Sequence, residues 1–314
     1  MRVAVVVTVR NEASSIVPLL DALSIQTRPA DQVIIVDGGS TDGTPALAKQ
    51  RSGKVPGLHV IEAPGADIAH GRNLGIAASV AEIIAVTDAG CIPSCEWVAA
   101  IAAPLENDPA LGLVIGGVTP NPSTHFEACV ARCSLTPDIR IAGMTVNPTA
   151  RSLAFPRWAW EAAGGFPEHP PFNRAEDGVF IERASRCGGV AHRPSATVLW
   201  RPRATYRAVL RQFYQYARGL GQLGASGTFH SRTVLQSAAG LALVGAGCVT
   251  GHWVPWIAMV ALGAAYLIRK ARAGCFAAPS WRTFYRVPAI LATIHIGTMA
   301  GIVHGAMLRV RNRT

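Results

Sequence analysis

Two adjacent acidic residues at the start of a predicted helix are the clearest candidates for catalysis. Glu176 and Asp177 follow a segment rich in proline and glycine, residues 164–171, and precede a helix-like run over residues 179–187. A helix N-terminus favours the charged form of a carboxylate, and a carboxylate at such a junction can take a proton from a hydroxyl. Acids are also common in the first turn of any helix, so an ordinary structural role stays open.

Two further polar segments lie where predicted strands end. Residues 8–12 complete an apolar run that starts at residue 3, and residues 37–40, Asp-Gly-Gly-Ser, follow a similar run that ends at residue 36. Ligands of parallel sheets bind at the carboxyl ends of the strands, and the N-termini of the helices that follow suit phosphate. We expect both segments to contact a phosphate-bearing ligand, although the glycines are equally compatible with plain turns.

An arginine and an aspartate supply the charges that such a ligand needs. Arg72 lies in a segment that packs as a helix, where it can clamp a phosphate with two N–H groups. Asp88 follows a buried strand over residues 82–87, and a carboxylate beside a phosphate site can hold a divalent cation. A lone aspartate at a strand end also serves as a turn residue, so both interpretations stay open.

Strands and helices alternate through the first part of the chain. The order strand, helix, strand, helix, strand over residues 3–61 is typical of a parallel sheet with covering helices. The seven cysteines include two C-x3-C pairs, which allow a zinc site. The same spacing also puts both sulfurs on one helix face, where cysteines pack as small apolar residues.

Charge is divided unevenly along the chain. Residues 1–182 hold all 19 acids and 12 of the 29 basic residues, whereas residues 183–314 hold the other 17 basic residues and no acid. A basic segment of this kind can face nucleic acid or anionic lipid. The apolar runs within it favour the membrane, so we expect no nucleic-acid partner.

Three apolar segments predict membrane helices, at about residues 233–250, 253–268 and 287–308. The basic residues between the second and third segments place that loop in the cytoplasm by the positive-inside rule. We therefore expect an inner or plasma membrane protein with a cytoplasmic catalytic domain. The basic tail after residue 308 would then lie outside, against the rule, unless the third segment lies in the interface. A buried pair of core helices is the soluble alternative.

These motifs, in this order, resemble the family 2 glycosyltransferases. The resemblance rests on residues 8–12, the Asp-Gly-Gly-Ser-Thr-Asp-Gly-Thr segment at 37–44, Gly-Arg-Asn at 71–73, Thr-Asp-Ala-Gly at 87–90, and Glu176-Asp177. It covers roughly residues 1–220. Within the family, the chain is most similar to membrane-anchored bacterial enzymes of exopolysaccharide assembly, of the succinoglycan type.

The resemblance implies a GT-A fold, a mixed and mostly parallel sheet with helices on both faces, over residues 1–220, with a basic membrane region over residues 221–314. It implies an inverting transferase that uses a nucleoside-diphosphate sugar. Asp177 matches the catalytic base, with Glu176 beside it, and Asp88 matches the position that binds a divalent cation, Mg²⁺ or Mn²⁺. The residues expected to bind the nucleotide-sugar are Thr8, Arg10, Glu12, Asp37, Gly38, Ser40, Arg72, Asp88 and Arg218.

Three positions depart from the family pattern. Gly90 stands where a second acid is common, and Trp200 follows the strand from which members can supply a metal-binding histidine. Gln215-x-x-Arg218-Gly219 resembles the Gln-x-x-Arg-Trp motif of processive members, but glycine replaces tryptophan. The departures weaken the expectation of metal dependence and argue against a processive synthase.

The predicted acceptor is lipid-linked or close to the membrane, in polysaccharide or glycolipid assembly, because the basic segment leads from the catalytic domain into the membrane. Two other functions stay open. A nucleotidyltransferase on a related fold would release pyrophosphate, and a membrane scaffold with a degenerate transferase domain would bind a nucleotide-sugar without turnover. The sequence does not indicate the oligomeric state.

Overall fold

Two units form within the chain, which we describe in a computed structural model. The structure describes residues 1–134, 139–141, 144–146, 149–168, 176–223, 239, 242, 246–272, 274–277 and 280–311. The first unit contains residues 1–121 and 139–201, and the second contains residues 122–138 and 202–314. The predicted boundary at residue 220 stays a prediction.

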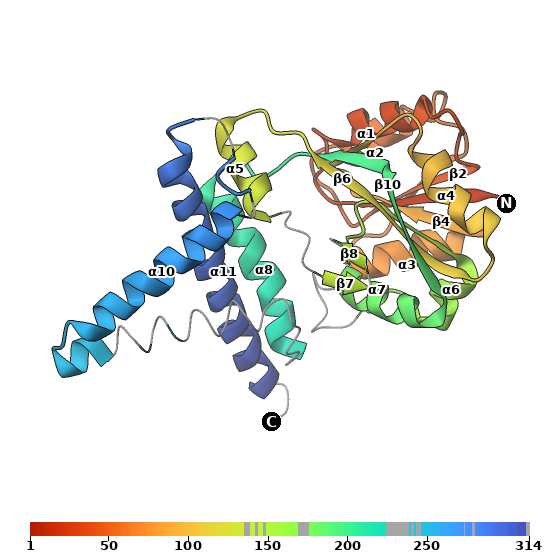
Figure 1. The fold of residues 1–314 in the computed structure, drawn as a ribbon. Helices are drawn as coiled ribbons and strands as arrows, with labels where there is room; N and C mark the ends of the chain where they lie inside the picture. The colour runs from red at the N-terminus through yellow and green to blue at the C-terminus, as the bar shows by residue number, and fades with distance from the viewer. Residues whose placement is uncertain are drawn as a thin grey trace. The chain divides into compact units, whose positions relative to one another are not determined.

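A mixed sheet forms the centre of the first unit (Figure 1). Its strands are β1 (Val3–Val9), β2 (Gln32–Asp37), β3 (Leu58–Glu62), β4 (Ile83–Val86), β5 (Cys91–Pro93), β6 (Leu111–Pro120), β9 (Leu153–Pro156) and β10 (Gly189–Trp200). Their spatial order is β3-β2-β1-β4-β9-β6-β10-β5. Neighbours pair in parallel from β3 to β4 and between β6 and β10, whereas β9 and β5 run antiparallel to their neighbours. A separate hairpin joins β7 (Ile139–Ile141) to β8 (Met144–Val146).

Helices cover both faces of this sheet, which confirms the predicted fold class. They are α1 (Ile16–Ser24), α2 (Thr44–Lys49), α3 (Ile68–Ala78), α4 (Trp97–Asn107), α6 (Arg157–Ala162) and α7 (Glu176–Cys187). In Figure 1, α3, α6 and α7 lie on the face opposite to α1 and α2. Glycines bring α3 close to the sheet, because a Cβ at Gly75 would lie 2.6 Å from Cγ1 of Val6. Alternate strand residues point to each face, so both faces are apolar and buried.

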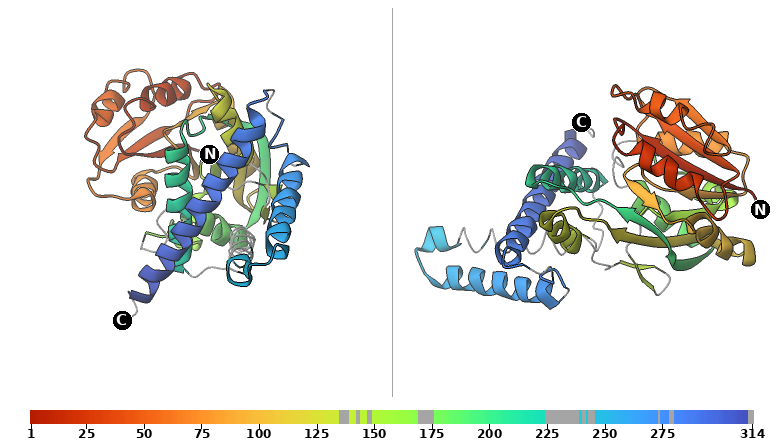
Figure 2. Two further views of the ribbon diagram at one scale, coloured as in Figure 1. Left: turned by 90° about the vertical axis from the view of Figure 1, so that its left-hand side faces the viewer. Right: turned by 90° about the horizontal axis from the view of Figure 1, so that it is seen from above.

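The second unit is helical in the residues that the structure describes. It contains α5 (His125–Ser134), α8 (Tyr206–Leu223), α10 (Val254–Arg272) and α11 (Thr283–Arg311). Helices α8 and α11 pack along one another (Figure 2). Gly297, Gly301 and Gly305 make this contact close, since a Cβ at any of them would clash with a carbonyl oxygen of α8.

The predicted apolar segments match the observed helices in part. Helix α10 begins at Val254, one residue after the predicted start, and residues 287–308 fall within α11. Both helices are long and apolar enough to cross a membrane. The segment predicted over residues 233–250 lies largely outside the described residues.

Candidate active site

Hydrogen bonds tie together the two polar segments that follow β1 and β2. The backbone N–H of Asn11 donates to Oγ of Ser40 over 2.8 Å, and the N–H of Thr41 donates to Oδ1 of Asn11 over 2.9 Å. The N–H of Glu12 donates to Oγ1 of Thr44 over 2.9 Å. Asn11 has a φ of 57°, a left-handed conformation that asparagine tolerates better than most residues. The two segments therefore contact each other directly, and their contact with a phosphate-bearing ligand stays a prediction.

Asp37 is buried and its carboxylate organises the turn after β2. Oδ2 accepts hydrogen bonds from the N–H of Gly39 over 3.1 Å and of Ser40 over 2.9 Å, and Oδ1 accepts one from Oγ of Ser40 over 2.5 Å. Gly38 is required by packing, since a Cβ there would lie 2.7 Å from the carbonyl oxygen of Ala66. Both residues thus shape the loop, and their contact with a nucleotide stays a prediction.

Arg72 joins two acids that are distant in the sequence. Its Nη1 donates to Oε1 of Glu176 over 2.9 Å, and its Nη2 donates to Oδ1 of Asp88 over 3.1 Å. The side chain of Arg72 is only 3% exposed. Arg72 was expected to clamp phosphate, but in the structure its terminal nitrogens contact carboxylates, so a direct contact with a diphosphate stays a prediction.

Aromatic packing holds this charged cluster in place. The guanidinium of Arg72 lies over the ring of Phe166, 5.2 Å from its centroid, and Phe166 stacks on Phe180 of α7 at 4.1 Å. Phe180 is fully buried beside the sheet. Because Phe180 lies one turn after Glu176, its burial fixes the start of α7 and directs Glu176 towards Arg72.

Glu176 is buried in an environment that disfavours its charge. Burial and the neighbouring charge of Asp177 raise the pKa of Glu176 to about 7, although Arg72 opposes this shift. Within the described part of the chain, Oε2 of Glu176 is buried without a hydrogen-bond partner. Burial alone would lower the pKa of Arg72, but the charges of Glu176, Asp88 and Asp177 outweigh it and raise that pKa. The site therefore keeps Arg72 charged. It also raises the pKa of Glu176 enough for the neutral, protonated carboxyl to form near pH 7.

Asp177 lies beside this cluster and is only partly buried. Its Oδ1 accepts a hydrogen bond from the N–H of Gly178 over 2.8 Å. Of the two adjacent acids, Asp177 is the more accessible, and Glu176 belongs to the buried ion pair. This difference fits the predicted division between a base and a supporting acid, which stays a prediction.

Arg151 approaches Asp88 and packs on Trp200, and sequence reasoning missed this arginine. Nε of Arg151 lies 4.0 Å from Oδ2 of Asp88, and its guanidinium lies over the Trp200 ring at 4.6 Å. The pairing of β4 with β9 places Val86 opposite Leu153, so the residues that flank this antiparallel pair face each other as well. No signal in the sequence indicates that β4 and β9 are neighbours.

The other predicted residues lie in different settings. Thr8, Glu12 and Ser40 are partly buried and Arg10 is exposed, all at the ends of β1 and β2. Ser15 donates through Oγ to the carboxylate of Glu12. Arg218 lies on α8 of the second unit, and its role in the site stays a prediction.

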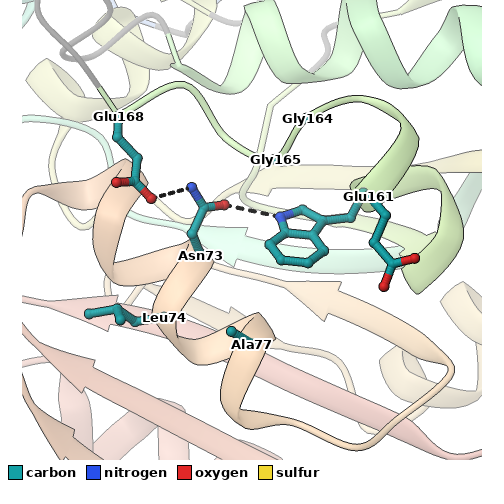
Figure 3. A pocket seen from close by; sticks show the side chains of 8 residues that line it. Asn73, Leu74, Ala77, Glu161, Gly164, Gly165 and Glu168 are labelled. Carbon is teal, nitrogen blue, oxygen red and sulfur yellow. Dashed lines mark hydrogen bonds between the residues drawn. The ribbon is translucent and has the colours of Figure 1, made fainter.

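A pocket of about 500 Å³ lies between α3 and the loop after α6 (Figure 3). Asn73 organises it: Nδ2 donates to Oε1 of Glu168 over 2.7 Å, and Oδ1 accepts from Nε1 of Trp160 over 3.0 Å. Trp160 therefore packs against Asn73 and helps to line the pocket. The pocket lining includes none of Arg72, Asp88 and Glu176.

Few of the described side chains at the candidate site could bind a metal ion. Among the described residues, no group of three or more His, Cys, Asp or Glu side chains gathers as a metal site would require. This covers the cysteines as well, so the zinc alternative gains no support there. Asp88 offers a 36% exposed carboxylate, which fits a cation that takes most of its ligands from phosphate and water.

Comparisons with known proteins find similar sequences. Residues 4–128 match the sequence model of the family described as Glycosyl transferase family 2. A stretch of 100 residues, 30% of this chain, is 38% identical to Glycosyltransferase AglE of Haloferax volcanii. The match spans 32% of that protein, so the chain covers about a third of the length of this curated relative.

Solved structures share the fold at low sequence identity. A mannosyltransferase from Pyrobaculum calidifontis, in complex with GDP-Man and Mn²⁺, has a TM-score of 0.62 at 23% identity, over 95% of this chain and 87% of that one. Glucosyl-3-phosphoglycerate synthase from Mycobacterium tuberculosis, in complex with Mn²⁺, UDP and glucosyl-3-phosphoglycerate, has a TM-score of 0.52 at 20% identity, over 72% and 81%. S. aureus TarS has a TM-score of 0.53 at 16% identity, over 100% and 91%.

Proposed function

We propose that the chain is a family 2 glycosyltransferase on a GT-A fold, which the match of residues 4–128 and the shared fold support, and that it transfers a sugar from a nucleoside-diphosphate sugar with inversion. The observation that carries this function is the buried cluster in which Arg72 joins Asp88 to Glu176. It draws the end of β4 and the start of α7 to one place, where a donor diphosphate and an acceptor hydroxyl can meet.

Asp177 is the proposed base of the reaction. It would take the proton of the acceptor hydroxyl as that oxygen attacks the anomeric carbon, while the bond to the diphosphate breaks. Arg72 holds Glu176 and Asp88 in position during this step. Negative charge develops on the leaving nucleoside diphosphate, and preorganised positive charge near Asp88 stabilises it.

The donor is proposed to lie across the ends of β1, β2 and β4. The loops that contain Asp37 and Ser40 would receive the nucleoside, with Thr8, Arg10 and Glu12 beside it. Guanosine and uridine are the first nucleosides to test, because the mannosyltransferase was solved with GDP-Man and the synthase with UDP.

A divalent cation is proposed to bind at Asp88, and the mannosyltransferase and the synthase were both solved in complex with Mn²⁺. When bound, it would neutralise charge on the diphosphate. Asp88 would hold this cation from the end of β4, and Arg72 fixes the carboxylate through Oδ1. Mg²⁺ and Mn²⁺ are both compatible with an oxygen ligand of this kind.

Membrane association is proposed through the second unit. Helix α10 has no buried residue and ends in Arg269, Lys270 and Arg272, which suits an apolar helix whose basic end faces anionic lipid at the cytoplasmic surface. Helix α11 packs against α8, which carries Arg207 and Arg211 in exposed positions. Arginines at the bilayer centre are costly, so the α8–α11 pair would lie at the membrane surface.

The acceptor is then proposed to be lipid-linked or close to the membrane, in polysaccharide or glycolipid assembly. Flotation of the full chain with vesicles of neutral and anionic lipid tests this location. We expect binding that falls when Ile257 and Val260, both exposed on α10, are replaced by aspartate. Equal flotation of this variant and the wild type would contradict a role for α10.

The activity is tested by incubating the full chain with UDP- and GDP-sugars, Mn²⁺ and membrane lipid extract. We expect transfer of sugar and release of nucleoside diphosphate, with Asp177→Asn reducing turnover by about 100-fold or more. Glu182→Gln is the matched control, because Glu182 lies on the same helix with a 65% exposed side chain. Release of pyrophosphate would indicate a nucleotidyltransferase, and binding without turnover would indicate a scaffold.

A further inference from the structure

Asp88 lies between two guanidinium groups that are held in different ways. Arg72 donates to Oδ1 over 3.1 Å and is also paired with Glu176. Nε of Arg151 lies 4.0 Å from Oδ2, which is an ion pair without a direct hydrogen bond. The position of Arg151 is therefore set by something other than a tight bond to Asp88.

The ring of Trp200 contributes to that support. The Arg151 guanidinium lies 4.6 Å from the ring centroid, within the range of a cation–π contact. Trp200 ends β10 and pairs with Cys91 of β5, and the N–H of Cys91 donates to the carbonyl of Asp88 over 3.0 Å. The side chain of Arg151 is 14% exposed. Arg151 is thus fixed by the sheet beside Asp88 and still reaches the surface.

The side chains around Asp88 therefore carry more positive charge than those of a site that coordinates a metal through several carboxylates. Gly90 stands where the family often has a second acid, and Trp200 supports an arginine instead of providing a ligand. A Cβ at Gly90 would meet no atom within 4 Å, so packing does not exclude a second carboxylate. At this point one carboxylate lies between two guanidiniums, and the guanidinium of Arg151 is the more exposed of the two.

We propose that Arg151, supported by Trp200, binds the diphosphate of the donor and supplies positive charge that a metal otherwise provides alone. A guanidinium binds phosphate oxygens through paired N–H groups and keeps its charge at all relevant pH values. This role rests on the proposed function, because it places the diphosphate beside Asp88. Its consequence is that nucleoside diphosphate binds with only a partial dependence on divalent metal.

The test measures the affinity of the full chain for GDP and UDP by calorimetry, in EDTA and in Mn²⁺. We expect the wild type to bind one of them in EDTA, within about tenfold of its affinity in Mn²⁺. Arg151→Met keeps a long side chain on Trp200 without the charge, and we expect a loss of about tenfold or more in EDTA. Arg151→Lys should recover part of that loss.

Two further variants make the result specific. Arg193→Gln removes one positive charge from an exposed position on β10, and we expect wild-type affinity. Gly90→Asp adds the missing carboxylate, and we expect weaker binding in EDTA and a larger gain from Mn²⁺. Thermal unfolding of each variant in the absence of nucleotide shows whether it is folded.

The outcomes separate this role from the proposed function. Wild-type affinity of folded Arg151→Met in EDTA would overturn the role of Arg151, and so would a wild type that binds only in Mn²⁺. In both cases the transferase function would stand, because donor still binds with metal. A wild type that binds no nucleoside diphosphate in either condition would overturn both.

Discussion

The candidate site has two sides, the turn around Asp37 and the charged cluster around Arg72, and different kinds of contact hold them. Around Asp37, neutral hydrogen-bond donors satisfy a buried carboxylate within a turn of four residues. Around Arg72, charged groups from segments 104 positions apart pair in the interior, and one carboxyl oxygen stays without a partner in the described structure. The proposed nucleoside side, around Asp37, is locally preorganised, whereas the proposed diphosphate side, around Arg72, depends on the assembled sheet.

This difference has an energetic meaning. A turn with satisfied hydrogen bonds forms with little reference to the rest of the fold, and each bond contributes modestly to stability. A buried ion pair loses much of its value to desolvation, but removal of one partner leaves an uncompensated charge and is strongly destabilising. The diphosphate side should therefore be the more sensitive of the two to single substitutions.

The largest expected effect comes from Arg72→Met. This change leaves Glu176 and Asp88 without their buried cation, and we expect the free energy of unfolding to fall by about 3–5 kcal/mol. Urea denaturation in mild detergent measures it. Arg51→Met is the control, since Arg51 pairs with Asp21 at the surface over 3.4 Å and should cost under about 1 kcal/mol. Equal losses of unfolding free energy in Arg72→Met and Arg51→Met would contradict the expected difference between a buried and an exposed ion pair.

Asp37→Ala should have an intermediate effect. It leaves the N–H groups of Gly39 and Ser40 without their acceptor, and we expect a loss of roughly 1–3 kcal/mol in unfolding free energy. Binding of the nucleoside part should weaken as well, which calorimetry with the free nucleoside measures. A loss of unfolding free energy as large as that of Arg72→Met would show that the turn around Asp37 depends on the rest of the fold as much as the Arg72 cluster does.

The smallest expected effect is a change in pH dependence. Because the pKa of Glu176 is raised to about 7 from an ordinary 4.5, the folded state keeps a proton that the unfolded state releases. This contribution to stability is present at low pH and is lost as pH rises through that window. Glu176→Gln should flatten the fall, by on the order of 1 kcal/mol between about pH 5 and 8. Glu182→Gln should keep the wild-type slope, and identical slopes in all three proteins would contradict the raised pKa.

The same contrast explains how much the sequence could predict. Thr8, Asp37, Ser40 and Asp88 lie at or just after the ends of apolar strands, so their place at one edge of the sheet could be inferred from the order of strands and helices. Arg151 could not be inferred, because the pairing of β4 with β9 joins segments that are distant in the sequence. The burial of Arg72 was missed for a similar reason, since Phe166 and Phe180 cover it only in the folded chain.

The apolar helices of the second unit show a related limit. Apolar runs predicted α10 and α11, but the close packing of α11 on α8 follows from three glycines whose neighbours the sequence does not reveal. Composition therefore indicates which segments are apolar, and tertiary contacts decide which of their faces remain available to lipid.

The central claim is that both sides of the site hold one nucleoside-diphosphate sugar. An experimental structure of the chain with its bound nucleoside diphosphate tests it most directly. We expect the base to lie at the loop of Asp37 and Ser40, and the diphosphate to lie beside Asp88 within hydrogen-bonding distance of Arg151. A nucleotide bound elsewhere, or one whose diphosphate lies away from Asp88, would contradict the account.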